Sequence, residues 1–151
     1  MKDISFLHAI RTATIREIQD LSVEQFNTIP AGFNNNIIWN AGHLVASEQR
    51  MIYSRSGQTP LVSAEFIARY QKGTRPEGYV HEAGINEIKK LLIESIDKFE
   101  QDYKNNMFTD YDAWTTSYGN TISNLDDAIT FLPFHEGLHS GCIKALKKLL
   151  K

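Results

Sequence analysis

The chain has 151 residues, which fits one domain, residues 1–151, large enough to bury a core without disulfides. The formal net charge of −2 gives no electrostatic basis for binding nucleic acid or a membrane surface. No apolar run is long enough for a membrane span or a secretory signal, and the single cysteine, Cys142, is compatible with a reducing compartment. We therefore expect a cytoplasmic protein without nucleic-acid or membrane partners.

Helical spacing dominates the first third of the chain and predicts two helices. The first covers roughly residues 3–27, and Arg11 is expected on one of its solvent-facing sides. The second runs from about Ile37 to Ser54, with an asparagine among residues 34–36 as its N-cap and Gly57 and Pro60 beyond its end. The buried stripe of the first helix is predicted to contain Ile4, Leu7, Ile10, Thr14, Ile18 and Leu21.

Two further helices follow a mixed region between residues 58 and 79, which we expect to be a crossover connection with a short helix over residues 63–71. A fourth long helix should begin near Ser123 or Asn124 and reach Leu150. No convincing strand pattern appears. The predicted fold class is all-α, a four-helix bundle with a long crossover connection between helices two and three. The third helix is indicated by Ile85, Ile88, Leu92, Ile96, Phe99 and Tyr103.

Pro133 conflicts with the pattern of the fourth helix. Its ring removes a backbone donor, clashes with the carbonyl of Ile129 and disfavours helical angles at Leu132. We therefore expect a kink or a break there, two residues before His135.

The same helix contains HEGLH, the H-E-x-x-H pattern of zinc metallopeptidases. His135 and His139 stand at i and i+4, so both imidazoles can reach one ion. Spacing alone leaves open that they are two buried histidines hydrogen-bonded to the protein. We place them toward the interior with a predicted core stripe of Phe131, His135, Leu138, Cys142, Ala145 and Leu149.

Two known metal classes do not fit this pattern. A zincin takes its third ligand from sequence beyond the motif, but no His, Asp or Glu follows His139. A di-iron bundle needs a second Glu-x-x-His unit, and no other glutamate has a histidine three residues later. Cys142 could add a ligand from the same helix, although a thiol at a core position more often only packs.

A third ligand is better sought upstream, in the segment IIWNAGHL. There Trp39 and His43 are themselves at i and i+4, and Gly42 allows a neighbouring helix to approach closely. His81 is expected in a polar loop, solvated. His8 could line a pocket, but its surroundings are not distinctive.

The segments WNAGHLVASEQRMI and FLPFHEGLHSGCIKALKKLL together resemble the DinB-like superfamily, also described as YfiT-like, and the resemblance covers essentially the whole chain. It implies a four-helix bundle that holds one divalent ion through three histidines. By position these are His43, His135 and His139. Zinc and nickel are the metals we expect, and iron or manganese also fit the ligand type.

Further roles are expected around this centre. Glu136 is the candidate catalytic residue, as a base or a partner of a ligand, although a surface glutamate is the simpler interpretation. Trp39, Phe134 and Cys142 are expected to line the pocket, and Glu48 and Gln49 are weaker candidates. Many relatives have Gly-Gln after the second histidine of H-x-x-x-H, whereas this chain has Gly141 and Cys142.

Two functions from different classes follow. Branches that resemble this fold include transferases and isomerases that use low-molecular-weight thiols such as bacillithiol, mycothiol or glutathione. The first hypothesis is thus a metal-dependent enzyme, a thiol S-transferase or a hydrolase, in which the ion activates a thiol or water for a small-molecule substrate. The second is a non-catalytic metal-binding or stress-response module. Exposed helix faces also suggest a homodimer.

Overall fold

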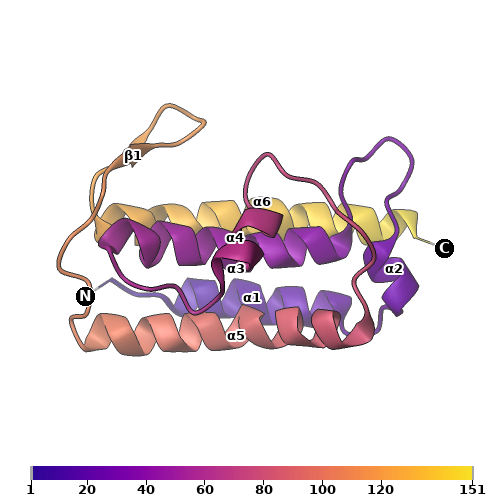
Figure 1. Cartoon of the computed structure of the whole chain (residues 1–151), viewed down its shortest axis with the longest axis horizontal. Helices are drawn as coiled ribbons and strands as arrows, with labels where there is room; N and C mark the ends of the chain where they lie inside the picture. The colour runs from indigo at the N-terminus through magenta and orange to yellow at the C-terminus, as the bar shows by residue number, and fades with distance from the viewer. Residues whose placement is uncertain (1, 151) are drawn as a thin grey trace.

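The computed structural model describes residues 2–150 and is mostly helical (Figure 1). Within these residues a two-stranded antiparallel hairpin, β1 (Trp114–Thr115) and β2 (Thr121–Ile122), accompanies the helices. The helices are α1 (Ser5–Ile18), α2 (Val23–Asn27), α3 (Ile37–Ile52), α4 (Ala64–Tyr70), α5 (Glu82–Lys104) and α6 (Leu125–Leu149), with a 3-10 turn η1 (Ser54–Ser56).

The four longest helices lie side by side along the length of the molecule (Figure 1). Helix α1 packs against α5 and α6, and α3 packs against the same two helices. The short α4 lies against α3, within the connection that leads from α3 to α5. Every residue of α3 except Arg50 is buried. No helix in the described part of the chain is long and apolar enough to cross a bilayer.

The caps expected for two helices are confirmed. The side chain of Asn36 accepts a hydrogen bond from the backbone of Trp39 at 2.9 Å, and Asn124 accepts one from Asp127 at 2.9 Å. Each asparagine oxygen satisfies a donor that the first helical turn leaves without an internal partner. The short helix expected over residues 63–71 is also confirmed, as α4.

The prediction of a single helix over residues 3–27 is wrong, because α1 ends at Ile18 and a second helix, α2, begins at Val23. Ser22 caps α2 by accepting a hydrogen bond from the backbone of Gln25, while the Gln25 side chain accepts one from the Ser22 backbone. This reciprocal capping box starts a new helix. Its Ser-x-x-Gln spacing is visible in the sequence, so the break could have been found.

Two other expectations concern the C-terminal part of the chain. Of the kink or break expected at Pro133, the break is wrong. Helix α6 continues through Pro133 without a break, because buried neighbours such as Ile129 and Leu132 hold the helix against the core on that turn. The loop before α6 was expected to lack strands, but it forms the hairpin with Trp114 opposite Ile122. This hairpin is too short for its alternation to be visible in the sequence.

The buried stripes of α1 and α6 differ from the predicted ones. Arg11 is fully buried although it was expected in solvent, and Ile10 is only half-buried. On α6 the buried residues include Glu136 and Ser140, whereas Leu138 and Leu149 are exposed at 46% and 52%. The predicted α6 stripe was therefore rotated around the helix, because it treated Glu136 as a surface residue.

A polar layer crosses the interior and separates two apolar clusters. Arg11 and Glu136 form a buried ion pair, in which Arg11 Nε and Nη2 donate to the two carboxylate oxygens at 2.6 Å. The guanidinium also donates to the backbone carbonyls of Leu92 and Leu44 at 3.0 and 3.1 Å. One side chain thus joins α1, α3, α5 and α6. Leu7, Ile52, Phe99 and Leu132 belong to one cluster, and Ile18, Leu44, Leu92 and Ile143 to the other.

Candidate metal centre

Three histidines from two helices meet on one side of this polar layer. His43 comes from the middle of α3, and His135 and His139 come from successive turns of α6. Their nearest ring nitrogens all lie within 4.8 Å of one another. His43 is buried, and the two α6 histidines are half-buried. The predicted convergence of these three residues is therefore present in the fold.

Hydrogen bonds fix which nitrogens of His43 and His139 face the centre. His43 Nδ1 lies 2.6 Å from the backbone carbonyl of Tyr70, and a carbonyl only accepts, so Nδ1 carries the proton. His139 Nδ1 lies 2.9 Å from the Asn40 side-chain oxygen, whose orientation is set because the Asn40 amide donates to the carbonyl of Asn36 at 2.8 Å. In both rings this leaves the Nε2 lone pair as a ligand.

The third ring completes a set of nitrogens that suits a metal. His135 Nε2 lies 3.3 Å from His43 Nε2. Two nitrogens bound to one zinc at 2.0–2.1 Å with tetrahedral angles would be about 3.3–3.4 Å apart. Within residues 2–150, His135 Nδ1 is buried without a hydrogen-bond partner. A divalent ion bound to the Nε2 atoms would leave the proton of the His135 ring on Nδ1, as in the other two rings.

Burial keeps the three imidazoles neutral, the form that binds metal. Burial lowers the pKa of His43. The hydrogen bond to Tyr70 acts to raise this pKa, and the nearby charge of Arg50 acts to lower it. Burial, then the two neighbouring histidines and Arg11, lower the pKa of His135 to about 3. Burial and the charge of His43 lower the pKa of His139 to about 4. At neutral pH all three are ready to coordinate.

The chain also matches the model of a known protein family. The family model of the DinB superfamily matches residues 7–143, a span that includes all three histidines. The chain belongs to the DinB superfamily. No curated protein shows a significant match to it.

The glycine before His43 controls how closely α4 approaches α3 in this DinB-superfamily chain. A Cβ at Gly42 would lie 2.6–2.8 Å from three ring atoms of Tyr70, which is itself buried. The expected close approach at Gly42 is thus confirmed. The consequence reaches the centre, because the contact brings the Tyr70 carbonyl to His43 Nδ1.

Gly42→Ala is expected to destabilise the protein by about 1–3 kcal/mol, because overpacking forces the Tyr70 ring away from α3. The same shift lengthens the hydrogen bond to His43, so metal affinity falls as well. Urea unfolding and a metal titration measure the two effects. Gly141→Ala is the matched control, since its Cβ would meet nothing within 4 Å and the substitution favours the helix. Equal stability for the two variants would contradict the prediction.

The lowered histidine pKa values also predict an acid-sensitive metal-free protein. Between pH 6.5 and about 4 the unfolded chain binds protons that the folded histidines do not, so stability falls as the pH drops through this window. The slope is at most about 1.4 kcal/mol per pH unit for each histidine. Urea unfolding at pH 7 and pH 5 with a chelator measures it.

His135→Gln serves as the control for that pH dependence and should show a shallower loss between pH 7 and pH 5. Burial raises the pKa of Glu48, although the charge of Arg11 acts to lower it. The raised Glu48 pKa makes stability rise as the pH falls, opposite to the effect of the histidines, and this contribution is the same in both proteins. An unchanged slope in His135→Gln would contradict the assignment.

The other predicted site residues occupy different positions. The Trp39 ring stacks on His43, with centroids 4.8 Å apart, and its indole donates to Thr74 at 3.1 Å. Phe134 is 49% exposed and contacts Tyr118 and Phe131 rather than a histidine. Cys142 is partly buried against the apolar cluster, and burial raises the pKa of its thiol.

Glu136 is fully buried, so its interpretation as a surface residue is wrong. Both of its oxygens accept hydrogen bonds from Arg11. Its catalytic role stays a prediction. Glu48 is buried in the same layer, and the Gln49 amide donates to both its oxygens at 3.1 and 3.0 Å.

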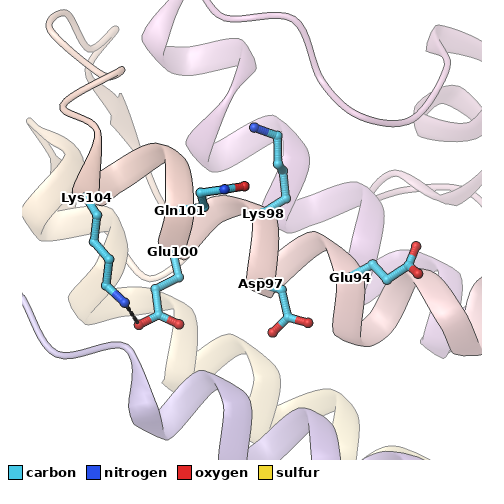
Figure 2. A pocket seen from close by; sticks show the side chains of 6 residues that line it. All are labelled: Glu94, Asp97, Lys98, Glu100, Gln101 and Lys104. Atoms are coloured by element: carbon cyan, nitrogen blue, oxygen red, sulfur yellow. Dashed lines mark hydrogen bonds and ion pairs between the residues drawn. The ribbon is translucent and has the colours of Figure 1, made fainter.

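The remaining histidines lie away from the centre. His81 is exposed at the start of α5, as expected. His8 bridges α1 and α5, with its nitrogens 3.1 Å from Glu100 and 3.5 Å from Asp97. Figure 2 shows the surface beside it, where Lys104 pairs with Glu100 on α5. Solvated ion pairs of this kind on a helix contribute only about 0.3–0.5 kcal/mol each. We therefore interpret the charged residues around Glu100 as part of the solvent-facing surface of α5.

Four residues around the centre were missed by the sequence interpretation. Asn40 and Ser47 share a face of α3 with His43, at spacings of three and four, and Ser47 Oγ lies 3.2 Å from His43 Nε2. That spacing was the available signal. Tyr70 acts through its backbone, and Arg11 meets Glu136 only in the folded chain, so neither gave a sequence signal.

Proposed function

We propose that the chain binds one divalent metal ion through the Nε2 atoms of His43, His135 and His139, and that it is a metal-dependent enzyme of thiol S-transferase or hydrolase type. The supporting observation is that two of the three rings have Nδ1 bonded to protein oxygens while the nitrogens converge. We further propose the four-helix-bundle topology of the superfamily for the long helices, with the α3–α5 connection as its crossover.

The residues present fit this role. Three neutral imidazoles from rigid helices suit zinc or nickel, and iron or manganese match the ligand type. When bound, such an ion lowers the pKa of a thiol or water that it binds, which supplies a nucleophile without a reactive serine or cysteine. The protein's part is to hold the rings, through Tyr70 and Asn40 on their outer nitrogens and Trp39 on the face of His43.

A low-molecular-weight thiol and a small-molecule substrate are the proposed ligands. Trp39 and Cys142 border the histidine-bearing turns of α3 and α6, and Phe134 lies one residue from His135. Ser47 supplies a hydroxyl directed at His43 Nε2, within reach of a group bound near the centre. We propose that Trp39, Cys142 and Ser47 shape the site, whereas Phe134 packs against Tyr118 and Phe131.

The alternative is a non-catalytic metal-binding module of the same fold. The observation that favours it is the pairing of Glu136, because a carboxylate that accepts two hydrogen bonds from a buried arginine is poorly placed to take a proton from a substrate. Glu136→Gln tests the catalytic prediction: loss of turnover with unchanged metal content and an unchanged circular dichroism spectrum would support it.

Cobalt substitution separates the two functions. The visible spectrum of Co²⁺ bound to the protein should change when a thiol is added if the centre has an exchangeable position, and a screen for thiol transfer with several thiols should then show turnover. A cobalt spectrum that no thiol alters favours the module. Failure of the protein to bind zinc, nickel or cobalt at neutral pH would contradict both functions.

A further inference from the structure

The one exposed residue of α3, Arg50, lies on the same face of the helix as His43. The two residues are seven positions apart, which is about two turns of helix and about 10 Å along its axis. Ser47 lies between them, and its Oγ is 3.2 Å from His43 Nε2. A line of side chains therefore leads from the three-histidine centre to the exposed guanidinium of Arg50.

The connection that follows α4 holds Arg50 beside the centre. The Tyr70 carbonyl lies 2.6 Å from His43 Nδ1, and the side-chain oxygen of the next residue, Gln71, accepts a hydrogen bond from Arg50 Nη1 at 3.2 Å. Burial lowers the pKa of His43, and the charge of Arg50 lowers it further, so the two groups interact through space. Gln71 is the one hydrogen-bond partner of this guanidinium among residues 2–150. Because a guanidinium has five N–H donors, a planar fork remains for a carboxylate.

This part of the chain is strongly basic, although the protein as a whole is not. Residues 50–75 contain five Lys or Arg and one acidic residue, whereas the whole chain has 16 basic and 18 acidic side chains. No carboxylate within residues 2–150 forms an ion pair with any of the five. A positive field that the protein does not neutralise, next to three uncharged imidazoles, attracts an anion. The five are Arg50, Arg55, Arg69, Lys72 and Arg75.

A purely structural role accounts less well for Arg50. The arginine that joins the helices of this fold is Arg11, which is fully buried and paired with Glu136. Arg50 instead is exposed and bonds to a neutral amide, an interaction that water replaces at little cost. Its charge is therefore available to a ligand.

We propose that Arg50 binds a carboxylate of the small molecule whose reacting group occupies the metal centre. This inference rests on the proposed function, because it requires an exchangeable position at the centre. It narrows the substrate class to anionic molecules. Since two turns of α3 separate His43 from Arg50, the carboxylate and the thiol of such a molecule are joined by a spacer of several bonds.

A matched pair of thiols tests this proposal on the Co²⁺-loaded protein. 6-Mercaptohexanoate ends in a carboxylate, and 6-mercaptohexanol has the same thiol but ends in a neutral hydroxyl. The dissociation constant of each is measured from the visible cobalt spectrum. In the wild type it should be about three- to tenfold lower for the carboxylate. Added salt should reduce this difference, because it screens an exposed charge.

Substitutions at Arg50 assign the preference to its side chain. Arg50→Gln should bind the two thiols equally well, and Arg50→Lys should keep part of the preference, because an ammonium retains the charge without the planar fork. Arg16→Gln is the matched control, since it removes an exposed arginine of α1 and should leave the preference unchanged. Elemental analysis and circular dichroism should show equal metal content and folding in every variant.

The outcomes separate this proposal from the one on which it rests. Equal affinities of the two thiols for the wild type overturn the role of Arg50 alone, as does an Arg50→Gln variant that keeps the full preference. A cobalt spectrum that neither thiol changes overturns the proposed enzyme and this inference with it.

Discussion

Replacing Arg11 with methionine is expected to lower the free energy of unfolding by about 3–5 kcal/mol. The substitution leaves Glu136 buried without its partner and removes donors from the carbonyls of Leu92 and Leu44. Burial alone would lower the pKa of Arg11, but the charge and hydrogen bonds of Glu136 outweigh it and raise that pKa, so the guanidinium stays charged. Urea unfolding at neutral pH measures the loss.

Two controls separate the loss of an ion pair from the loss of contact between α1 and α6. The double variant Arg11→Met, Glu136→Met removes both charges and should recover part of the stability lost in the single variant. Thr14→Val breaks a neutral contact between the same helices, from Thr14 to Ser140 at 3.3 Å, and should cost only about 1 kcal/mol. Additive effects of the two methionine substitutions would contradict a coupled pair.

Alanine at any one of His43, His135 and His139 is expected to reduce metal affinity by more than about 100-fold. Removing a residue that only supports a ligand costs up to about 100-fold, and removing the ligand itself should cost more. Each substitution removes one of three converging nitrogens. Elemental analysis of purified protein and competition with a chromophoric chelator measure the change. The thermal stabilisation that metal gives to the wild type should disappear in the same variants.

His81→Ala is the control for these variants, because it removes an exposed histidine outside the centre. Its metal content should equal that of the wild type. If the three ligand variants retain one ion per chain, the three-histidine centre is wrong. If only one of them does, that residue is not a ligand.

Local signals made much of the fold and the centre predictable. Asparagine caps, repeated apolar positions and the glycine and proline residues between them mark α3, α4 and α6 within a few residues of where they occur. The i, i+4 spacing of His135 and His139 places both imidazoles on neighbouring turns whatever the tertiary structure is. His43 was found because its segment, together with HEGLH, resembles the superfamily.

The polar layer was unpredictable for a physical reason. A buried arginine and a buried glutamate stabilise each other only when they meet, and Arg11 and Glu136 are far apart in the sequence. Considered separately, each is more favourable in water, which led to the rotated stripe on α6 and to the solvent-facing position predicted for Arg11. The pairing between α1 and α6 depends on tertiary structure that no single helix encodes.

The stacking of Trp39 on His43 gives the centre an optical signal of its own. Trp39 is 6% exposed, whereas the other tryptophan, Trp114, lies in the hairpin and donates to Tyr111. An indole stacked on a ring that we propose as a metal ligand senses the charge of that ring and any paramagnetic ion bound to it. In a Trp114→Phe variant, where Trp39 is the one remaining indole, fluorescence should therefore follow the loading of His43 in real time.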